Sequence, residues 1–278
     1  MYYVLKILID LVIFLFINQI TKIIYSLIIQ PICILLSKSF PSFTFKIPKK
    51  CKPIINTKRN ELIPKIIFQT DKTSEVSFAF YINFLILRLF NPTFEYRFYD
   101  DNDIDLFIKL NYESCYNYYK NIKIGAFKSD LFRILVLHHY GGYYIDTDRS
   151  FFMPLIYNKD KDIVLFNDRA LGYNVKKTNK SKKNDYDIFC MDVFGFRKNN
   201  IILSDTIKKI EKLDIKKNKT SLPILFDTVL EKYYKLRENI QIINISFIMH
   251  NHVILTNYLH YNFPEKRLSW TKEKNLLK

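Results

Sequence analysis

Two aspartates, Asp146 and Asp148, are the residues of this 278-residue chain best placed to do chemistry. They follow a short β-prone run, Tyr143–Ile145, and one residue separates them. Residues i and i+2 of an extended chain point to the same face, so both carboxylates aim at one point. Because like charges repel, such a pair needs a proton or a cation. We expect a hard divalent ion, Mn²⁺ or Mg²⁺, bound together with a phosphate.

A second pair, Asp130 and Arg133, lies upstream at a spacing that places both side chains on one face of a helix. An aspartate and an arginine together can hold a polyhydroxylated or anionic ligand. Simpler interpretations exist, because a lone Asp-x-Asp is often a solvated turn and an exposed ion pair contributes little. The order of the features favours a site: acid and base on a helix, two glycines, a strand, then the acidic pair.

The elements around these residues are predictable from the pattern. Residues 126–139 contain no Gly or Pro and carry a broad apolar face, which predicts a helix. Gly141 and Gly142 end it, and we expect them to let the backbone approach the site closely. Residues 63–68 predict a buried strand, with Gln69 and Thr70 at its carboxyl end facing the ligand crevice.

The rest of the chain alternates between the two kinds of element. We expect helices at 77–90, 103–110, 200–213 and 222–230, and strands at 95–99, 162–166 and 188–196. This alternation predicts an α/β domain with an open, mostly parallel sheet and helices on both faces.

Three segments carry a family resemblance, in the order IPKIIFQT (63–70), NPTFEYRFYDD (91–101) and SDLFRILVLHHYGGYYIDTD (129–148). Together they resemble the DXD-containing sugar transferases of glycosyltransferase family 32 and, more distantly, the glucosylating domains of large clostridial toxins. An ordered set of motifs is far more specific than any one alone. Two positions depart from the family, since Phe68 stands where it has His and Asp71 where it usually has Trp. A stacking aromatic for the nucleotide base is therefore missing at residue 71.

The resemblance implies a GT-A-type fold and transfer of a hexose, with retention, from a UDP- or GDP-sugar to a hydroxyl of a glycan or glycolipid. It implies Asp146 and Asp148 as metal ligands, with His260 as a third by loose similarity to the family's ending. The donor-binding residues would be Gln69, Thr70, Asp130, Arg133, Gly141 and Gly142. No residue stands out as a nucleophile.

Two other functions remain open. A metal-dependent phosphotransferase could use the same acidic pair, with further ligands from Asp100, Asp101 and Asp103. A membrane-tethered carbohydrate-binding protein with a degenerate transferase site is the second, and Asp71 in place of an aromatic is its best support.

The amino-terminal region predicts a membrane partner. Residues 1–36 are strongly apolar and are expected to form a single-pass anchor, followed by a basic, Pro-containing stem (37–60) and the catalytic domain (61–278). The alternative is a helix lying in the membrane interface. The lysines after the segment favour a cytoplasmic catalytic domain, whereas the resemblance implies a luminal one, so the side is left open.

The net charge of +16 is best explained by a lysine-rich surface. No zinc-finger spacing or RNA-binding aromatic motif accompanies the basic clusters, and we expect no nucleic-acid partner. The four cysteines, Cys33, Cys51, Cys115 and Cys190, show no metal-type spacing and imply no disulfide framework.

Overall fold

The structure is a computed structural model, which describes residues 20, 23–40, 43–57, 61–147, 149, 154–155, 160–167, 189–213, 222–234 and 240–244. A π-helical turn, η1 (Tyr25–Ile29), leads into the first α-helix. The α-helices are α2 (Gln30–Ser39), α3 (Phe78–Phe90), α4 (Asp101–Asn111), α5 (Glu113–Asn121), α6 (Gly125–Tyr140), α7 (Ile201–Glu211) and α8 (Leu222–Tyr234). The strands are β1 (Phe45–Lys46), β2 (Lys50–Cys51), β3 (Ile66–Thr70), β4 (Glu75–Val76), β5 (Glu95–Tyr99), β6 (Gly142–Ile145), β7 (Ile163–Asn167), β8 (Phe189–Phe196) and β9 (Ile240–Asn244).

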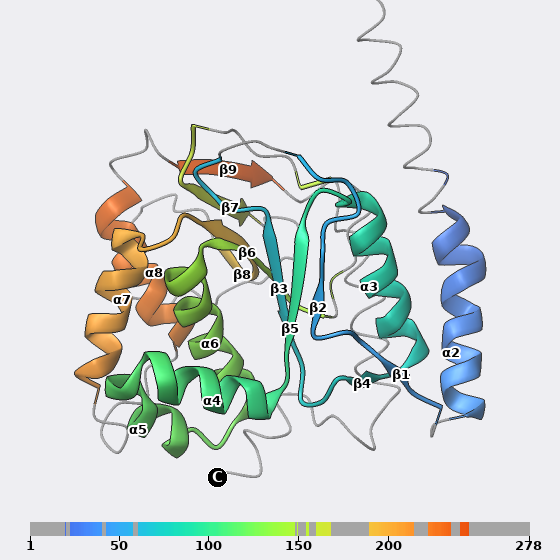
Figure 1. The fold of residues 1–278 in the computed structure, drawn as a ribbon, viewed down its shortest axis with the longest axis horizontal. Coiled ribbons are helices and arrows are strands. Elements are labelled where there is room, and N and C mark those ends of the chain that lie inside the picture. Colours follow the sequence, from blue (N-terminus) through green and yellow to red (C-terminus); the bar gives the residue numbers. More distant parts are fainter. Residues whose placement is uncertain are drawn as a thin grey trace, which may run out of the picture.

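A mixed sheet with the order β2-β5-β3-β6-β8-β7-β9 forms the centre of the described molecule (Figure 1). Strands β3, β5, β6, β7 and β9 point in one direction, and β2 and β8 run against their neighbours. The predicted α/β class and the parallel centre of the sheet, β5-β3-β6, are confirmed. Strand β9 was not predicted, and β8 is antiparallel to both of its neighbours, β6 and β7.

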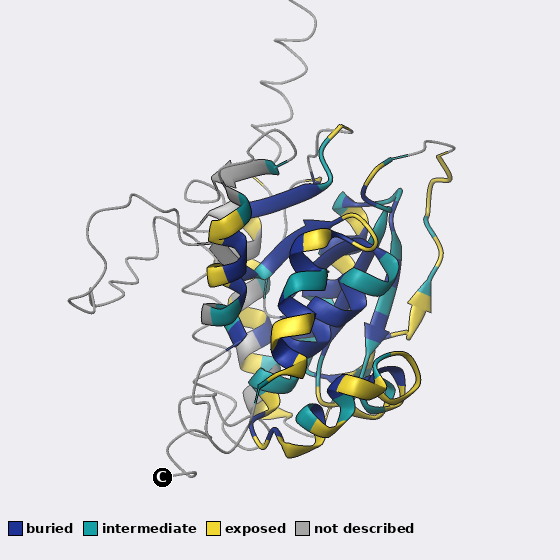
Figure 2. Ribbon diagram, turned by 90° about the vertical axis from the view of Figure 1, so that its left-hand side faces the viewer, coloured by how far each residue is buried: buried dark blue, intermediate teal, exposed yellow. Residues whose placement is uncertain are grey.

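Helices cover both faces of the sheet because successive strand residues point to opposite sides. Phe68 and Tyr144 contribute to the core beneath α4 to α8, whereas their neighbours Ile67 and Tyr143 contribute to the core beneath α3. Figure 2, seen from the side of α4 to α8, shows buried residues in the strands and inner helix turns and exposed ones on the outer turns. The result is a three-layer arrangement with a core on each side of the sheet.

Helix α6 and strand β6 match their predicted limits closely and belong to the most buried part of the fold. Every residue of α6 from Asp130 to Leu137 is buried, as are all four residues of β6. Gly141 has a φ of +68° and its N–H donates to the Leu137 carbonyl at 2.8 Å, which ends the helix as the sequence predicted. The tight turn places β6 directly after α6 and fixes the position of the residues that follow it.

Replacing Gly142 with alanine should destabilise the fold by at least about 1–3 kcal/mol, the usual cost of a strained backbone conformation. Gly142 has a φ of +116°, and a Cβ there would lie 2.6 Å from the carbonyl oxygen of Ile66 in β3. The matched control is Gly125→Ala, since a Cβ at this first residue of α6 meets nothing within 4 Å. Denaturant unfolding measures both variants. Equal stability of the two would contradict the packing described.

Candidate active site at the carboxyl end of β6

The site is built around the guanidinium of Arg133, which joins three elements. Its Nη2 lies 3.3 Å from Oδ1 of Asp130, one turn earlier on α6, and 3.2 Å from Oδ1 of Asp146, the residue directly after β6. Its Nη1 donates to the carbonyl of Met191 in β8 at 2.5 Å. The structure therefore brings together three of the predicted site residues, and it does so in the interior, because Asp130 and Arg133 are only 8% and 6% exposed.

Burial and charge set the protonation of this cluster. Burial by itself lowers the pKa of Arg133, but the Asp146, Tyr144 and Asp130 groups outweigh it, and the net pKa is raised, so the guanidinium stays charged. Burial raises the pKa of Asp130, and Arg133 partly opposes this shift. The alternative of a solvated surface ion pair is thus excluded by the burial of both side chains.

Tyr144 orients the carboxylate of Asp146. Burial, and then the neighbouring Asp146 carboxylate, raise the pKa of Tyr144 well above its ordinary value, so the phenol keeps its proton. Its hydroxyl donates to Oδ1 of Asp146 at 2.8 Å, and the Arg133 guanidinium lies 4.6 Å from the centre of its ring. Asp146 is thereby oriented by two donors while its side chain remains 29% exposed.

Gln69 lies beside Asp146, as its predicted position at the carboxyl end of β3 requires. Its Nε2 donates to the backbone carbonyl of Asp146 at 3.2 Å, and its Oε1 accepts from the Tyr96 hydroxyl at 3.0 Å. Both ends of this buried amide are therefore fixed. Thr70 instead donates to the carbonyl of Tyr99 at 2.7 Å, which links β3 to β5.

The two glycines are placed differently from their predicted role. Gly141 and Gly142 lie at the start of β6, whereas Asp146 follows its end, and their close neighbours are Lys198, Pro64 and Ile66. Their close approach therefore serves the packing of the α6–β6 turn against the strand beside it. The prediction that they bind the donor finds no support in this position.

Asp192 is a candidate residue that the sequence prediction missed. It lies in β8, and its carbonyl accepts from the Asp146 N–H at 2.8 Å, so the two residues are direct neighbours across the sheet. Its Oδ2 forms an ion pair with Arg149, whereas its buried Oδ1 has no hydrogen-bond partner among the described residues. A carboxylate inside the otherwise apolar run FCMDVFGF was the available signal.

The donor atoms at this edge suit a hard divalent cation. Carboxylate oxygens are the preferred ligands of Mg²⁺ and Mn²⁺, and a buried carboxylate oxygen without a protein partner is commonly met by a water or an ion. Asp148 and His260, the other predicted ligands, lie outside the described residues. Within the described part of the chain, no group of three or more His, Cys, Asp or Glu side chains could hold a metal ion.

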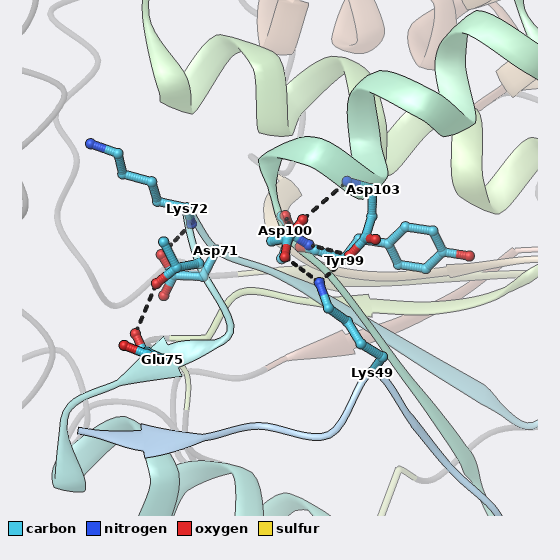
Figure 3. A network of polar contacts seen from close by, with 9 residues as sticks. Lys49, Asp71, Lys72, Glu75, Tyr99, Asp100 and Asp103 are labelled. Carbon is cyan, nitrogen blue, oxygen red and sulfur yellow. Dashed lines mark hydrogen bonds and ion pairs between the residues drawn. The ribbon is translucent and has the colours of Figure 1, made fainter.

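The acidic residues after β5 have a structural role. Asp100 and Asp103 form a capping box at the start of α4, and Lys49 pairs with both carboxylates (Figure 3). Burial acts to raise the pKa of Asp100, but Lys49 and the Asp103 backbone amide outweigh it and hold that pKa below its ordinary value. The engagement of Asp100 and Asp103 by Lys49 and by the capping box counts against their use as further metal ligands in the phosphotransferase alternative.

The fold and site define an α/β protein with polar and charged groups gathered at the carboxyl ends of its central parallel strands, where such sheets bind ligands. Residues 48–159 match the model of a family described as "Glycosyltransferase sugar-binding region containing DXD motif". This match confirms the resemblance seen in the three motifs.

The curated relatives are fungal. Inositol phosphoceramide mannosyltransferase 2 of Schizosaccharomyces pombe is 34% identical over 110 residues, which are 37% of this chain and 32% of that protein. Mannosyl phosphorylinositol ceramide synthase CSH1 of Saccharomyces cerevisiae is 33% identical over 88 residues, 32% of this chain and 23% of that protein. The chain thus matches less than a third of the length of either relative. A solved structure, the PaToxG glycosyltransferase, aligns over 94% of this chain and 92% of its own with a TM-score of 0.47 and 15% identity.

Proposed function

We propose that the protein is a metal-dependent glycosyltransferase that moves a hexose from a UDP- or GDP-sugar to a hydroxyl of a glycan or lipid acceptor, with retention. The observation that carries this proposal is the cluster of Asp130, Arg133 and Asp146 at the carboxyl end of β6. It lies inside the segment that matches the glycosyltransferase family. The names of the fungal relatives support a mannosyl donor and a glycolipid acceptor as the first candidates to test.

In this proposal, four residues of the site bind the donor or position Asp146. Arg133 supplies a permanent positive charge next to the place where a diphosphate would lie. Asp130 offers carboxylate oxygens that accept hydrogen bonds from sugar hydroxyls. Tyr144 and Gln69 hold the Asp146 side chain and backbone in place. Preorganised charge of this kind stabilises the developing leaving group without further rearrangement.

Asp146 and Asp148 would hold the divalent ion. When bound, such an ion neutralises charge on the nucleoside diphosphate as the glycosidic bond breaks. Among the described residues, two features support this site. The carboxylate oxygens of Asp146 can ligate a metal, and the neighbouring Oδ1 of Asp192 has no hydrogen-bond partner there.

Membrane attachment is also part of the proposal. None of the helices formed by the described residues is long and apolar enough to cross a membrane. The apolar residues 1–19, which the predicted anchor includes, lie outside the described ranges. The support for an anchor is therefore the apolar sequence itself, together with the lysines that follow it.

The function is tested by hydrolysis of a panel of UDP- and GDP-hexoses, with a mannosyl donor first. The full chain in detergent is assayed with Mn²⁺, with Mg²⁺ and with a chelator, beside the double variant Asp146→Asn/Asp148→Asn. We expect metal-dependent release of the nucleotide from one donor and its loss in the double variant. Metal-independent sugar binding without turnover of any donor, equal in the double variant, would instead establish the carbohydrate-binding alternative.

A further inference from the structure

The outer face of α3 is apolar, although α3 lies at the periphery of the domain. Its inner face, with Phe80, Phe84 and Leu87, packs on the sheet. Its two polar residues that would suit a surface, Asn83 and Arg88, are both buried. Arg88 donates to the carbonyls of Phe94 and Lys52. The helix therefore exposes no charged side chain, in contrast to an ordinary surface helix.

Helix α2 covers this outer face only in part. Ile29 and Cys33 pack against Phe78 and Ile82 of α3, so α2 lies along the domain (Figure 1). Two leucines of α3 remain outside this contact, since Leu85 is 43% and Leu89 is 70% exposed. The C-terminal part of the apolar amino-terminal segment is thus attached to the catalytic domain and does not stand apart from it.

The opposite side of η1 and α2 is apolar as well. Leu27 and Ile28 of η1 and Ile32 and Leu35 of α2 are between 46% and 71% exposed. A helix that is apolar on both sides is normally buried on both sides, and an extended apolar patch marks an interaction surface. We call the four residues of this side, together with Leu85 and Leu89, the α2–α3 face.

Two observations indicate what covers the α2–α3 face. The chain upstream of the face, residues 1–26, is strongly apolar and carries only Lys6, Asp10 and Lys22 as charged residues, so the same apolar environment has to accept it. The segment downstream carries the exposed Lys46 beside Phe45, whose ring lies 5.3 Å from that of Phe78 at the start of α3. Of the lysines that follow, Lys49 pairs with Asp100 and Asp103, and Lys50 pairs with Glu95. An apolar surface that continues an apolar segment, with a lysine nearby, matches a lipid bilayer with anionic headgroups.

A second copy of the chain is the alternative occupant of this face. It would bury the same patch against itself, and the apparent burial would then depend on protein concentration, which the test below measures. We propose instead that the α2–α3 face lies in the membrane interface, with α2 along the plane of the bilayer and Leu85 and Leu89 of the domain in contact with lipid. This surface does not depend on the proposed enzymatic activity.

The test measures lipid contact at α3, away from the amino-terminal segment. Leu89→Trp is made in the 278-residue chain that carries Trp270→Phe, which removes the one tryptophan of this sequence. The matched control is Leu110→Trp on α4, since Leu110 is 71% exposed and α4 lies on the other side of the molecule (Figure 1). Each protein is reconstituted into phosphatidylcholine–phosphatidylserine vesicles, with or without brominated acyl chains.

We expect the emission of the Leu89→Trp protein to shift to the blue and to be quenched severalfold more by brominated lipid than that of the Leu110→Trp protein. Equal, weak quenching of both proteins would overturn the proposal. A blue shift of the Leu89→Trp emission that grows with protein concentration, without quenching by brominated lipid, would also overturn the proposal. It would assign the face to contact with a second copy of the chain. Leu85→Trp repeats the measurement, should the thermal unfolding midpoint of Leu89→Trp differ from that of its parent.

Discussion

Replacing Arg133 with alanine should lower turnover of the nucleotide-sugar by two or more orders of magnitude and destabilise the fold by about 3–5 kcal/mol. The guanidinium is the common partner of Asp130 and Asp146, and it also donates to the Met191 carbonyl. Its removal leaves the buried Asp130 carboxylate without its cation, and the free energy of unfolding falls accordingly. Turnover is measured per folded molecule, and stability by denaturant unfolding.

Arg88 provides a matched control for Arg133. It is similarly buried, at 7% against 6% exposed, and it likewise donates to backbone carbonyls, those of Phe94 and Lys52. It packs on the α3 side of the sheet, away from Asp146. Arg88→Ala leaves the carbonyls of Phe94 and Lys52 without this donor, so the free energy of unfolding should fall by about 1–3 kcal/mol. Turnover per folded molecule should be unchanged. An equal loss of turnover in both variants would show that Arg133 acts only through the fold.

Arg133→Lys separates charge from geometry. Lysine retains the positive charge but not the planar fork that contacts Asp130, Asp146 and Met191 together. We expect this variant to recover part of the stability and little of the turnover. Full recovery of turnover would mean that charge alone is sufficient.

The second large effect is expected for Asp146→Asn, which should reduce turnover by on the order of 10²–10³-fold and weaken the response to added Mn²⁺. The substitution keeps an oxygen that can accept from Tyr144 and Arg133, so the structural change is small. What it removes is the negative charge that the metal requires. Initial rates measured across a Mn²⁺ titration report both effects.

Asp205→Asn is the control for Asp146→Asn. Its side chain is 22% exposed against 29% for Asp146, and it forms ion pairs with Lys208 of α7 and Lys232 of α8. Asp205 lies on α7 and not at the end of β6. The turnover rate and the Mn²⁺ response of the Asp205→Asn protein should therefore equal those of the unmodified protein. An unchanged metal response in the Asp146→Asn protein would remove Asp146 from the proposed metal site.

Local patterns were sufficient to predict most elements of this protein. The uninterrupted apolar face of α6, the Gly141–Gly142 stop and the short run of β6 are features of neighbouring residues, and they matched the structure almost to the residue. The i, i+3 spacing of Asp130 and Arg133 likewise predicted their shared face. Such signals depend on backbone geometry within one or two helix turns, which the sequence determines directly.

Contacts between distant segments were decided only by the tertiary structure. The sequence did not show that Asp192 would pair with Asp146, because this depends on β8 joining the sheet antiparallel to β6. It did not show that Lys49 would form ion pairs with Asp100 and Asp103, or that α2 would pack on α3. Each contact joins residues more than 40 positions apart. Their pairing follows from strand order and from the burial of apolar faces, which local residue patterns do not encode.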